Sequence, residues 1–307
     1  MIRKKVLIIG YGSIGRRHAA ILKKKPKFIK NIYVLTKQNC EPFKRINSLQ
    51  KVSLINPDYV IVSSPSSEHY KQLQFLEKTL SKKLILVEKP LFTKNEKLSI
   101  KKNKVFVGYN MRFNPLIQFI RKKIKNKKIW SINIFCGSYL PNWRPNRDYK
   151  YTASAKRKLG GGVILDLSHE LDYTQWLLGN IKIENVVSKK LSNLKINTDD
   201  FLSISGKANG SIRVQIDLNY FTKKETRKII IDGENISINA DLIKNKIFVD
   251  EKNKKSIFSK PNLHKNISYE KQHISLLNND FKVCCNYKEG KKLMVLISKI
   301  KKFSKAT

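Results

Sequence analysis

Asp166, His169 and Asp172 follow one another at intervals of three residues in a segment with a helical pattern, and this spacing could support acid–base chemistry. Apolar residues recur at helical spacing over 163–178, and Gly179 is a typical left-handed stop. Since a helix turns by about 100° per residue, neighbouring members of the set are separated by roughly 60°. A histidine flanked by carboxylates can be held in one tautomer and take a proton near neutral pH. A solvated surface helix would carry the same residues, so the spacing alone leaves both interpretations open.

A second candidate site lies at the start of the chain. The run Val6–Ile9 is apolar without interruption, as in a parallel strand covered on both faces. It leads into Gly10-Tyr11-Gly12-Ser13-Ile14-Gly15, which matches G-x-G-x-x-G. These glycines allow a tight turn, the close approach of a pyrophosphate and the packing of helix on strand. A strand before the motif and a helix after it predict a dinucleotide site; a methyl-donor cofactor and a chance match are the alternatives.

Thr36 and Lys37 follow the predicted strand Asn31–Leu35, at the position that bears on the choice of dinucleotide. An acidic residue there holds the ribose 2′-hydroxyl of NAD. A hydroxyl and a cation favour a 2′-phosphate, so NADP is the favoured cofactor and NAD the alternative. Lys37 could equally be one more solvated lysine in a lysine-rich chain.

Three later apolar runs, which begin at Tyr59, Leu84 and Val105, are predicted parallel strands. Ligands of an open parallel sheet bind at the carboxyl ends of its strands. The candidate cofactor contacts at these ends are Ser64, Pro65, His69, Glu88, Lys89 and Asn110. Pro90 fixes the backbone beside Lys89, which is a way to hold a lysine at a set position. His69 could instead be a helix-start residue that contacts no ligand.

These motifs occur in an order that resembles one oxidoreductase family. The shared features are the segment 10–15 with His18, the turn 64–65 with His69, the tripeptide 88–90, the segment 108–113 and the segment 160–172. Over residues 4–179 the chain resembles the glucose-fructose oxidoreductase / inositol dehydrogenase family (Gfo/Idh/MocA), and beyond Gly179 the likeness is one of strand pattern only. The resemblance implies NAD(P)-dependent hydride transfer to or from a secondary hydroxyl or ketone of a sugar, sugar acid, nucleotide-sugar or cyclic polyol. Surface-glycan synthesis is one setting for such a reaction.

The resemblance also implies which residues take part in catalysis. The lysine of the Glu-Lys-Pro motif and the histidine after the triple glycine carry over to Lys89 and His169. The usual family pattern has one more residue between its aspartate and its histidine, so either Asp166 or Asp172 could orient His169. The candidate catalytic residues are therefore Lys89, Asp166, His169 and Asp172. A cofactor-holding regulator or scaffold without turnover is the alternative, and the retention of these side chains speaks against it.

Polar and aromatic residues gather in a predicted loop over 139–149. Trp143 offers a face for a sugar ring, while Arg144 and Arg147 could hold a carboxylate or phosphate through paired hydrogen bonds. The candidate substrate-binding residues are Arg112, Trp143, Arg144 and Asp148. A loop that only packs across a domain junction would carry the same residues, and that alternative stays open.

The length of 307 residues suits two domains. We expect a dinucleotide-binding Rossmann domain over 1–114, built on a doubly wound parallel sheet. Residues 115–307 are expected to form an α+β domain on a mostly antiparallel sheet, which binds substrate and oligomerises. Predicted turns at Asn209-Gly210 and Asp232-Gly233 separate strands of that sheet. Helices on one face would leave the other face free for a second subunit, so a homodimer or homotetramer is expected.

The formal net charge of +40 raises the question of nucleic-acid binding. Lysines are spread from Lys4 to Lys305, and no helix-turn-helix, zinc knuckle or aromatic-basic platform accompanies them. We therefore expect a small-molecule carbohydrate substrate and no nucleic-acid partner, with a charge that steers anionic ligands.

No apolar run reaches the ~20 residues of a membrane helix. The run Val6–Ile9 is also too short for the core of a signal peptide, so we expect a cytoplasmic protein with no membrane partner. The cysteines show no metal-ligand spacing, and no metal site is expected. They are Cys40, Cys136, Cys284 and Cys285.

Overall fold

The computed structural model describes residues 2–306, with side chains up to Phe303, and divides into two compact units. The first unit comprises residues 2–110 and Asn266–Met294, and the second comprises Met111–Lys265 and residues 295–306. The boundary expected after Asn114 lies close to Met111 in the sequence. The sequence pattern had not indicated that Asn266–Met294 would return to the first unit.

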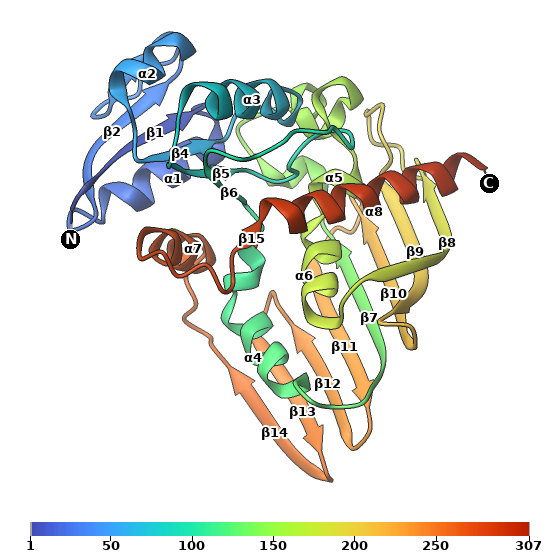
Figure 1. The fold of residues 1–307 in the computed structure, drawn as a ribbon. Helices are drawn as coiled ribbons and strands as arrows, with labels where there is room; N and C mark the ends of the chain where they lie inside the picture. Colours follow the sequence, from blue (N-terminus) through green and yellow to red (C-terminus); the bar gives the residue numbers. More distant parts are fainter. Residues whose placement is uncertain (1, 307) are drawn as a thin grey trace. The chain divides into compact units, whose positions relative to one another are not determined.

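A seven-stranded sheet forms the centre of the first unit, in the order β15-β6-β5-β4-β1-β2-β3 (Figure 1). Its strands are β1 (Lys4–Ile9), β2 (Ile29–Leu35), β3 (Lys44–Ile46), β4 (Tyr59–Val62), β5 (Leu84–Val87), β6 (Lys104–Val107) and β15 (Cys285–Asn286). All neighbours pair in parallel except β15, which pairs antiparallel with β6. Apolar residues fill these strands because both faces of the sheet are covered. The predicted doubly wound parallel sheet is confirmed.

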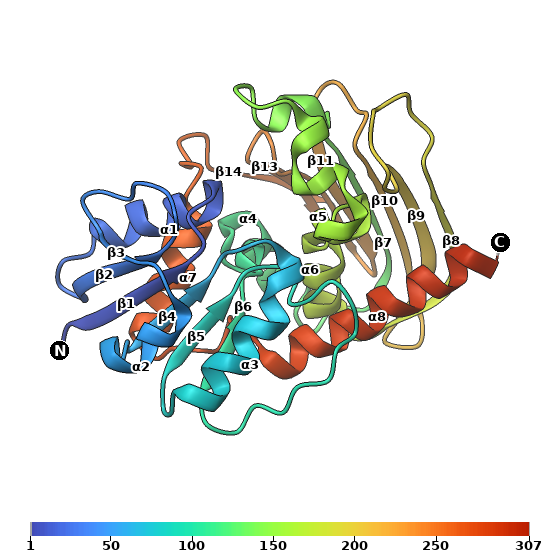
Figure 2. The ribbon, with the colours of Figure 1, turned by 90° about the horizontal axis from the view of Figure 1, so that it is seen from above.

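Helices lie on both faces of this sheet. Figures 1 and 2 show α1 and α7 on one face and α3 on the other. The helices with residues in this unit are α1 (Ser13–Lys23), α2 (Val52–Ile55), α3 (His69–Thr79), α7 (Ile267–Leu277) and the beginning of α8 (Tyr287–Ala306). The expected alternation of strands and helices fails between β2 and β3, over 36–43, and again between β5 and β6, where the connection is irregular over 88–103. Lysines interrupt its few apolar residues, so no apolar helical stripe is available to pack on the sheet.

The second unit is built on an eight-stranded sheet in the order β14-β13-β12-β11-β7-β10-β9-β8. Its strands are β7 (Ile129–Gly137), β8 (Ile181–Lys189), β9 (Phe201–Ala208), β10 (Ile212–Asn219), β11 (Thr226–Gly233), β12 (Ile236–Asp241), β13 (Lys246–Glu251) and β14 (Lys254–Ser259). Only the pair of β7 and β10 is parallel among these described strands. The predicted mostly antiparallel sheet is confirmed, and β14 is a strand that the sequence pattern did not indicate.

One face of this sheet is covered and the other is open. The helices α4 (Pro115–Ile124) and α6 (His169–Leu178) lie against the covered face (Figures 1 and 2). Burial alternates along β9 and β11, as expected for a sheet with one core face. No helix within residues 2–306 is long and apolar enough to cross a lipid bilayer.

The two predicted hairpin turns have different outcomes. Asn209 and Gly210 connect β9 and β10 with φ angles of 46° and 83°, as the sequence predicted. The second prediction is wrong, because Asp232 and Gly233 belong to β11 and the turn follows them, with Asn235 at φ 56°. A Cβ atom at Gly233 would lie 2.5 Å from the Lys128 carbonyl oxygen. This glycine therefore permits a close backbone approach inside the sheet.

Candidate active site

The three motif glycines after β1 have different surroundings. Gly10 has φ +91°, and a Cβ atom there would lie 2.6 Å from the Ser64 backbone nitrogen. A Cβ atom at Gly15 would lie 2.1 Å from the Gly10 carbonyl oxygen, so this glycine allows α1 to pack on the strand. At Gly12 no described atom lies within 4 Å of the corresponding position. Protein atoms therefore lie against the turn at Gly10 and Gly15. At Gly12 the turn is open, and a pyrophosphate would approach there.

The segment after Gly12 turns directly into a helix. Ser13 and Ile14 open α1, with Gly12 at the N-cap. Backbone amides at a helix start point outward and, together with the helix dipole, favour a phosphate group. The predicted phosphate-binding residues therefore have the local geometry that the dinucleotide prediction requires. His18, on the same helix, is fully buried instead of facing this site.

The loop after β2 brings a second cation beside Thr36 and Lys37. The Arg16 guanidinium lies 4.6 Å from the centroid of the Tyr11 ring and donates a 2.8 Å hydrogen bond to Gln38 Oε1. Thr36 Oγ1 accepts a 3.0 Å hydrogen bond from the Gln38 backbone nitrogen. Lys37 is exposed. Arg16 lies on α1, and no local sequence pattern connects it with the loop after β2.

His69 is buried and holds two strand ends together. Its Nδ1 lies 3.0 Å from the Pro90 carbonyl oxygen, and its Nε2 lies 3.1 Å from the Ser64 carbonyl oxygen. Burial lowers the pKa of His69, while the hydrogen bonds to the carbonyl groups oppose this shift. Ser64 Oγ in turn donates a 2.6 Å hydrogen bond to Gln72, and Pro65 is exposed at the turn. The geometry gives His69 a backbone-fixing role, and its contact with the cofactor stays a prediction.

Glu88 is also buried, with both carboxylate oxygens engaged. Oε1 lies 3.0 Å from His18 Nε2, and Oε2 accepts a 3.2 Å hydrogen bond from the backbone nitrogen of Lys89. A Cβ atom at Gly108 would lie 2.7 Å from Oε1, so the glycine makes room for the carboxylate. Asn110 is buried and donates a 2.9 Å hydrogen bond to Ser268 Oγ of α7. Lys89 itself is half-buried at the end of β5.

The predicted single helix over 163–178 is interrupted in the structure. It consists of α5 (Val163–Asp166) and α6 (His169–Leu178), and the break falls at Leu167 and Ser168. Ser168 Oγ donates a 2.9 Å hydrogen bond to the Leu165 carbonyl oxygen at this point. The 60° relation expected between Asp166 and His169 on one continuous helix is therefore wrong. Both residues are half-buried.

Asp166 accepts a 2.6 Å hydrogen bond from the hydroxyl group of Tyr220, which follows β10. Tyr220 is fully buried, and burial together with the Asp166 charge raises the pKa of Tyr220 well above its usual value. The Trp143 ring packs edge-on against Tyr220, with centroids 5.3 Å apart. Tyr220 was missed by sequence reasoning, because a tyrosine after an ordinary strand carries no signal of its own.

Asp172 and Arg112 bind to each other. Arg112 donates hydrogen bonds of 2.9 Å from Nε and 2.7 Å from Nη2 to the two carboxylate oxygens of Asp172. Their exposed fractions are 3% and 2%, so this bidentate pair is closed to solvent. The pair therefore fixes η3 (Asn110–Phe113) on α6. Substrate binding by Arg112 and orientation of His169 by Asp172 stay predictions.

A second ion pair, between the half-buried Arg227 and the buried Glu170, holds α6 on the sheet. Arg227 Nε of β11 lies 2.8 Å from Glu170 Oε1, and Glu170 is fully buried. Cys136 lies beside this pair, and burial raises the pKa of its thiol to about 12. Two ion pairs, at Glu170 and Asp172, therefore attach the first turn of α6, which begins at His169.

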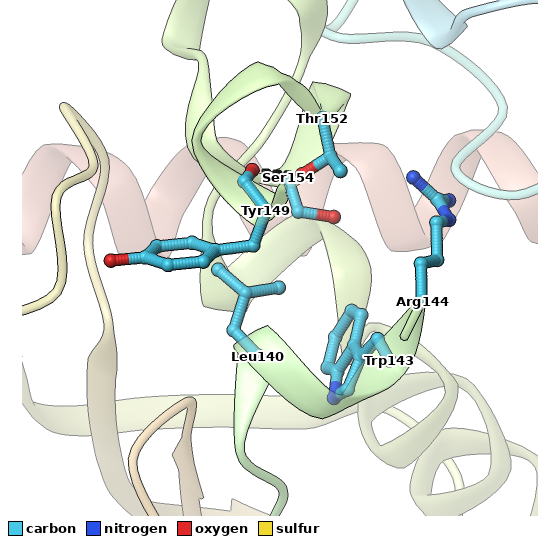
Figure 3. Close-up of a pocket in the computed structure, with 6 residues that line it drawn as sticks. All are labelled: Leu140, Trp143, Arg144, Tyr149, Thr152 and Ser154. Carbon is cyan, nitrogen blue, oxygen red and sulfur yellow. Dashed lines mark hydrogen bonds between the residues drawn. The ribbon is translucent and has the colours of Figure 1, made fainter. Parts of the chain in front are cut away.

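The predicted loop over 139–149 forms short turns around a small pocket. The turns are η4 (Leu140–Trp143), η5 (Tyr149–Tyr151) and η6 (Ala153–Ala155). Figure 3 shows the six residues that line the pocket, which are Leu140, Trp143, Arg144, Tyr149, Thr152 and Ser154. Trp143 and Arg144 lie beside each other (Figure 3). Trp143 Nε1 donates a 2.8 Å hydrogen bond to Ser138 Oγ. The pocket brings together two of the four predicted substrate contacts.

Asp148 has a local role in the same segment. It caps η5, since its carboxylate accepts a 3.0 Å hydrogen bond from the backbone nitrogen of Lys150. This hydrogen bond holds the pKa of Asp148 below its usual value. Arg147 is exposed and donates a hydrogen bond to the Tyr151 carbonyl oxygen.

Family models cover most of both units. Residues 4–104 match the family described as an oxidoreductase family with an NAD-binding Rossmann fold, and residues 117–239 match the GFO/IDH/MocA C-terminal domain. No curated protein sequence matches the chain.

Solved structures share the fold at low sequence identity. The WlbA dehydrogenase from Bordetella pertussis, in complex with NADH and UDP-GlcNAcA, matches with a TM-score of 0.80 and 17% identity, over 99% of this chain and 97% of that one. A levoglucosan dehydrogenase in complex with NADH has a TM-score of 0.86 and 14% identity, with coverage of 99% and 98%. The UDP-N-acetylglucosamine 3-dehydrogenase GnnA from Acidithiobacillus ferrooxidans has a TM-score of 0.76 and 16% identity, with coverage of 100% and 99%.

Proposed function

Because the chain belongs to the Gfo/Idh/MocA family of NAD(P)-dependent oxidoreductases, we propose that it acts on a secondary hydroxyl or ketone of a sugar or nucleotide-sugar. The observation that carries the proposal is the turn after β1, where Gly12 is open beside the N-terminus of α1. Two structures with this fold carry names of sugar or nucleotide-sugar dehydrogenases, and a third is a dehydrogenase in complex with UDP-GlcNAcA, which supports the substrate class. When bound, the dinucleotide supplies or accepts the hydride.

We propose NADP as the preferred dinucleotide and NAD as the alternative. The loop after β2 presents Thr36 and Lys37 where an acidic residue would hold the ribose of NAD. Arg16, fixed by Tyr11 and Gln38, adds a second cation at this loop. A 2′-phosphate would gain from both cations, whereas a 2′-hydroxyl would lack its usual acceptor.

In the proposed reaction, His169 exchanges the proton of the reacting hydroxyl group. Lys89 donates a hydrogen bond to the same oxygen and stabilises its developing negative charge. Asp166, held by Tyr220, provides the carboxylate that orients the histidine. The remaining predicted catalytic residue, Asp172, contributes by anchoring α6 through Arg112.

The test combines two variants with a substrate screen. Thermal-shift measurements with each dinucleotide, followed by sugars and nucleotide-sugars with the dinucleotide present, identify a substrate. His169→Ala and Lys89→Ala should then slow single-turnover hydride transfer by about 10²- to 10⁴-fold without loss of dinucleotide binding. Wild-type rates in His169→Ala from about pH 6 to 9 would show that another group carries the proton.

We also propose that the open face of the second sheet joins two or more subunits. Apolar side chains are exposed on it at Phe135, Ile230, Phe248 and Ile257, with exposed fractions between 37% and 59%. Ile257 and Phe248 are direct neighbours on β14 and β13. Light scattering on Phe248→Asp should give a smaller particle than the wild type, and equal masses would refute this interface.

A further inference from the structure

A chain of four buried titratable side chains runs through the first unit. Glu88 Oε1 lies 3.0 Å from His18 Nε2, His18 Nδ1 lies 2.8 Å from His273 Nε2, and His273 Nδ1 lies 2.9 Å from the Tyr59 hydroxyl oxygen. Both histidines and Tyr59 have exposed fractions of 0%, and that of Glu88 is 6%. The proposed chemistry uses none of His18, His273 or Tyr59 directly.

Four separate elements contribute these side chains. Tyr59 opens β4, Glu88 follows β5, His18 lies on α1 and His273 lies on α7. The two histidine rings meet edge to face with centroids 5.0 Å apart, although 255 residues separate them in the sequence. The return of residues 266–294 to the first unit therefore completes the chain.

The hydrogen-bond geometry favours one direction of proton donation, from Tyr59 through His273 and His18 to Glu88. Burial raises the pKa of Tyr59 well above its usual value, so its hydroxyl group keeps its proton and can donate to His273 Nδ1. A neutral imidazole carries one proton, so His273 then donates from Nε2 to His18 Nδ1. His18 in turn donates from Nε2 to Glu88, and every link has one donor and one acceptor.

The opposite direction fits less well. It would require a protonated Glu88 and would leave the Tyr59 proton without an acceptor among the described atoms. Glu88 Oε2 already accepts the backbone hydrogen bond of Lys89, as expected for a carboxylate that receives donors at both oxygens. Burial also lowers the pKa of His273 well below its usual value, which keeps this ring neutral.

We propose that His273 and Tyr59 are positioning residues that, through His18 and Glu88, hold the backbone of Lys89 in place. This inference rests on the proposed role of Lys89 in the reaction. The Glu88 carboxylate fixes the Lys89 nitrogen, while His69 fixes the neighbouring Pro90 carbonyl group at 3.0 Å. Loss of the Tyr59 or His273 link would free the Glu88 side chain and loosen one of these two attachments.

The first test does not depend on activity. Nitrogen NMR of the full chain at about pH 7.5, where free imidazoles are mostly neutral, should show His18 and His273 with their protons on Nε2. Tyr59→Phe removes only the hydroxyl group and should shift the His273 Nδ1 resonance. Protons on Nδ1 of both rings would overturn the direction of the chain.

The second test measures the attachment of Lys89. Amide hydrogen exchange at Lys89 should be about 10-fold faster in Tyr59→Phe and His273→Gln than in the wild type, since a supporting hydrogen bond is lost. Tyr33→Phe, on β2 of the same sheet, is the matched control and should leave this exchange rate unchanged. Unchanged exchange in both chain variants would overturn the positioning role, even if no carbohydrate is ever turned over.

The third test separates positioning from general destabilisation. With a substrate identified, Tyr59→Phe and His273→Gln should each lower kcat by up to about 100-fold, because a small displacement of a reacting group slows the reaction to this extent. The KM for the dinucleotide should change less than twofold. Equal kcat values in folded variants and wild type would overturn the proposal, whereas an inactive wild type would refute only the proposed function.

Discussion

At the scale of single residues, the sequence pattern singled out candidate side chains but did not indicate their partners. The spacing of Asp166, His169 and Asp172 suggested one polar strip, but the structure gives Asp166 a tyrosine partner and Asp172 an arginine partner. Arg112 lies 60 positions before Asp172, the residue it binds, and no local pattern connects the two. Partner choice depends on tertiary contacts, which residue spacing does not encode.

The first residue-scale prediction concerns Tyr220→Phe. This change removes the 2.6 Å hydrogen bond to Asp166 and keeps the buried ring, so the carboxylate should lose its fixed orientation. We expect kcat to fall by about 10-fold, in line with the loss of one hydrogen bond to a charged group, with unchanged dinucleotide affinity. Steady-state kinetics with the carbohydrate from the screen measures both quantities.

Tyr151→Phe is the control for that experiment, because Tyr151 is 64% exposed. It should behave as the wild type. If Tyr220→Phe also retains full kcat, Asp166 does not depend on this hydroxyl group.

The second residue-scale prediction concerns the dinucleotide. Lys37→Ala and Arg16→Ala should each weaken NADPH binding by about 10-fold, the size of one charge-assisted hydrogen bond, and leave NADH binding unchanged. Fluorescence titration of the wild type and both variants gives the six dissociation constants. If the wild type binds NADH as tightly as NADPH or more tightly, and Lys37→Ala does not change this, Lys37 is an ordinary solvated lysine without a role in the choice of dinucleotide.

At the scale of secondary-structure elements, the strands were the most predictable part. Apolar runs located β1, β4 and β5 because both faces of a parallel sheet are covered. The break between α5 and α6 was not predictable, since Leu167 and Ser168 are compatible with a continuous helix. It depends on the Ser168 hydroxyl group and on the contacts that hold each short helix separately.

The element-scale prediction concerns the attachment of α6 by Asp172. Asp172→Ala leaves the Arg112 guanidinium buried without its carboxylate, which should lower the free energy of unfolding by about 3–5 kcal/mol. Urea denaturation measures this change. The exposed ion pair of Lys128 and Glu234, at 3.5 Å, is the matched comparison.

Glu234→Ala should change the free energy of unfolding by less than about 0.5 kcal/mol, because both partners are solvated. The double variant Arg112→Met with Asp172→Ala should recover part of the loss. A loss below about 1 kcal/mol in Asp172→Ala would show that the pair is not what anchors α6.

At the scale of the whole molecule, the two-part organisation was predictable from length and motif order. The participation of Asn266–Met294 in the first unit was not, because α7 carries an ordinary helical pattern. Its contribution is visible only in three dimensions, where Ser268 meets Asn110 and His273 meets His18.

The molecule-scale prediction concerns acid stability. Burial lowers the pKa of both His69 and His273 in the folded protein. Unfolded imidazoles take up a proton below about pH 6.5, so the unfolded state binds more protons than the folded one in mildly acidic solution. Stability should therefore fall as the pH drops from about 6.5 to 5, by up to about 1.4 kcal/mol per pH unit for each histidine.

Thermal and urea unfolding across this pH range test the prediction. His273→Gln should reduce the slope of the unfolding free energy against pH by the equivalent of up to one proton. His264→Gln, which changes an exposed histidine, should leave this slope unaltered. A slope that is the same in all three proteins would assign the acid sensitivity to other groups.

The position of Asn266–Met294 late in the sequence also affects when the first unit can fold during translation. Residues 111–265 must be synthesised before it emerges, which takes on the order of 10 s at typical elongation rates. Until then β6 lacks its neighbour β15, and α1 lacks α7 against its apolar side. An unpaired strand and uncovered apolar surface are the features that chaperones bind and that promote misassembly. The nascent Rossmann unit therefore depends on the ribosome completing most of the second unit before it can close.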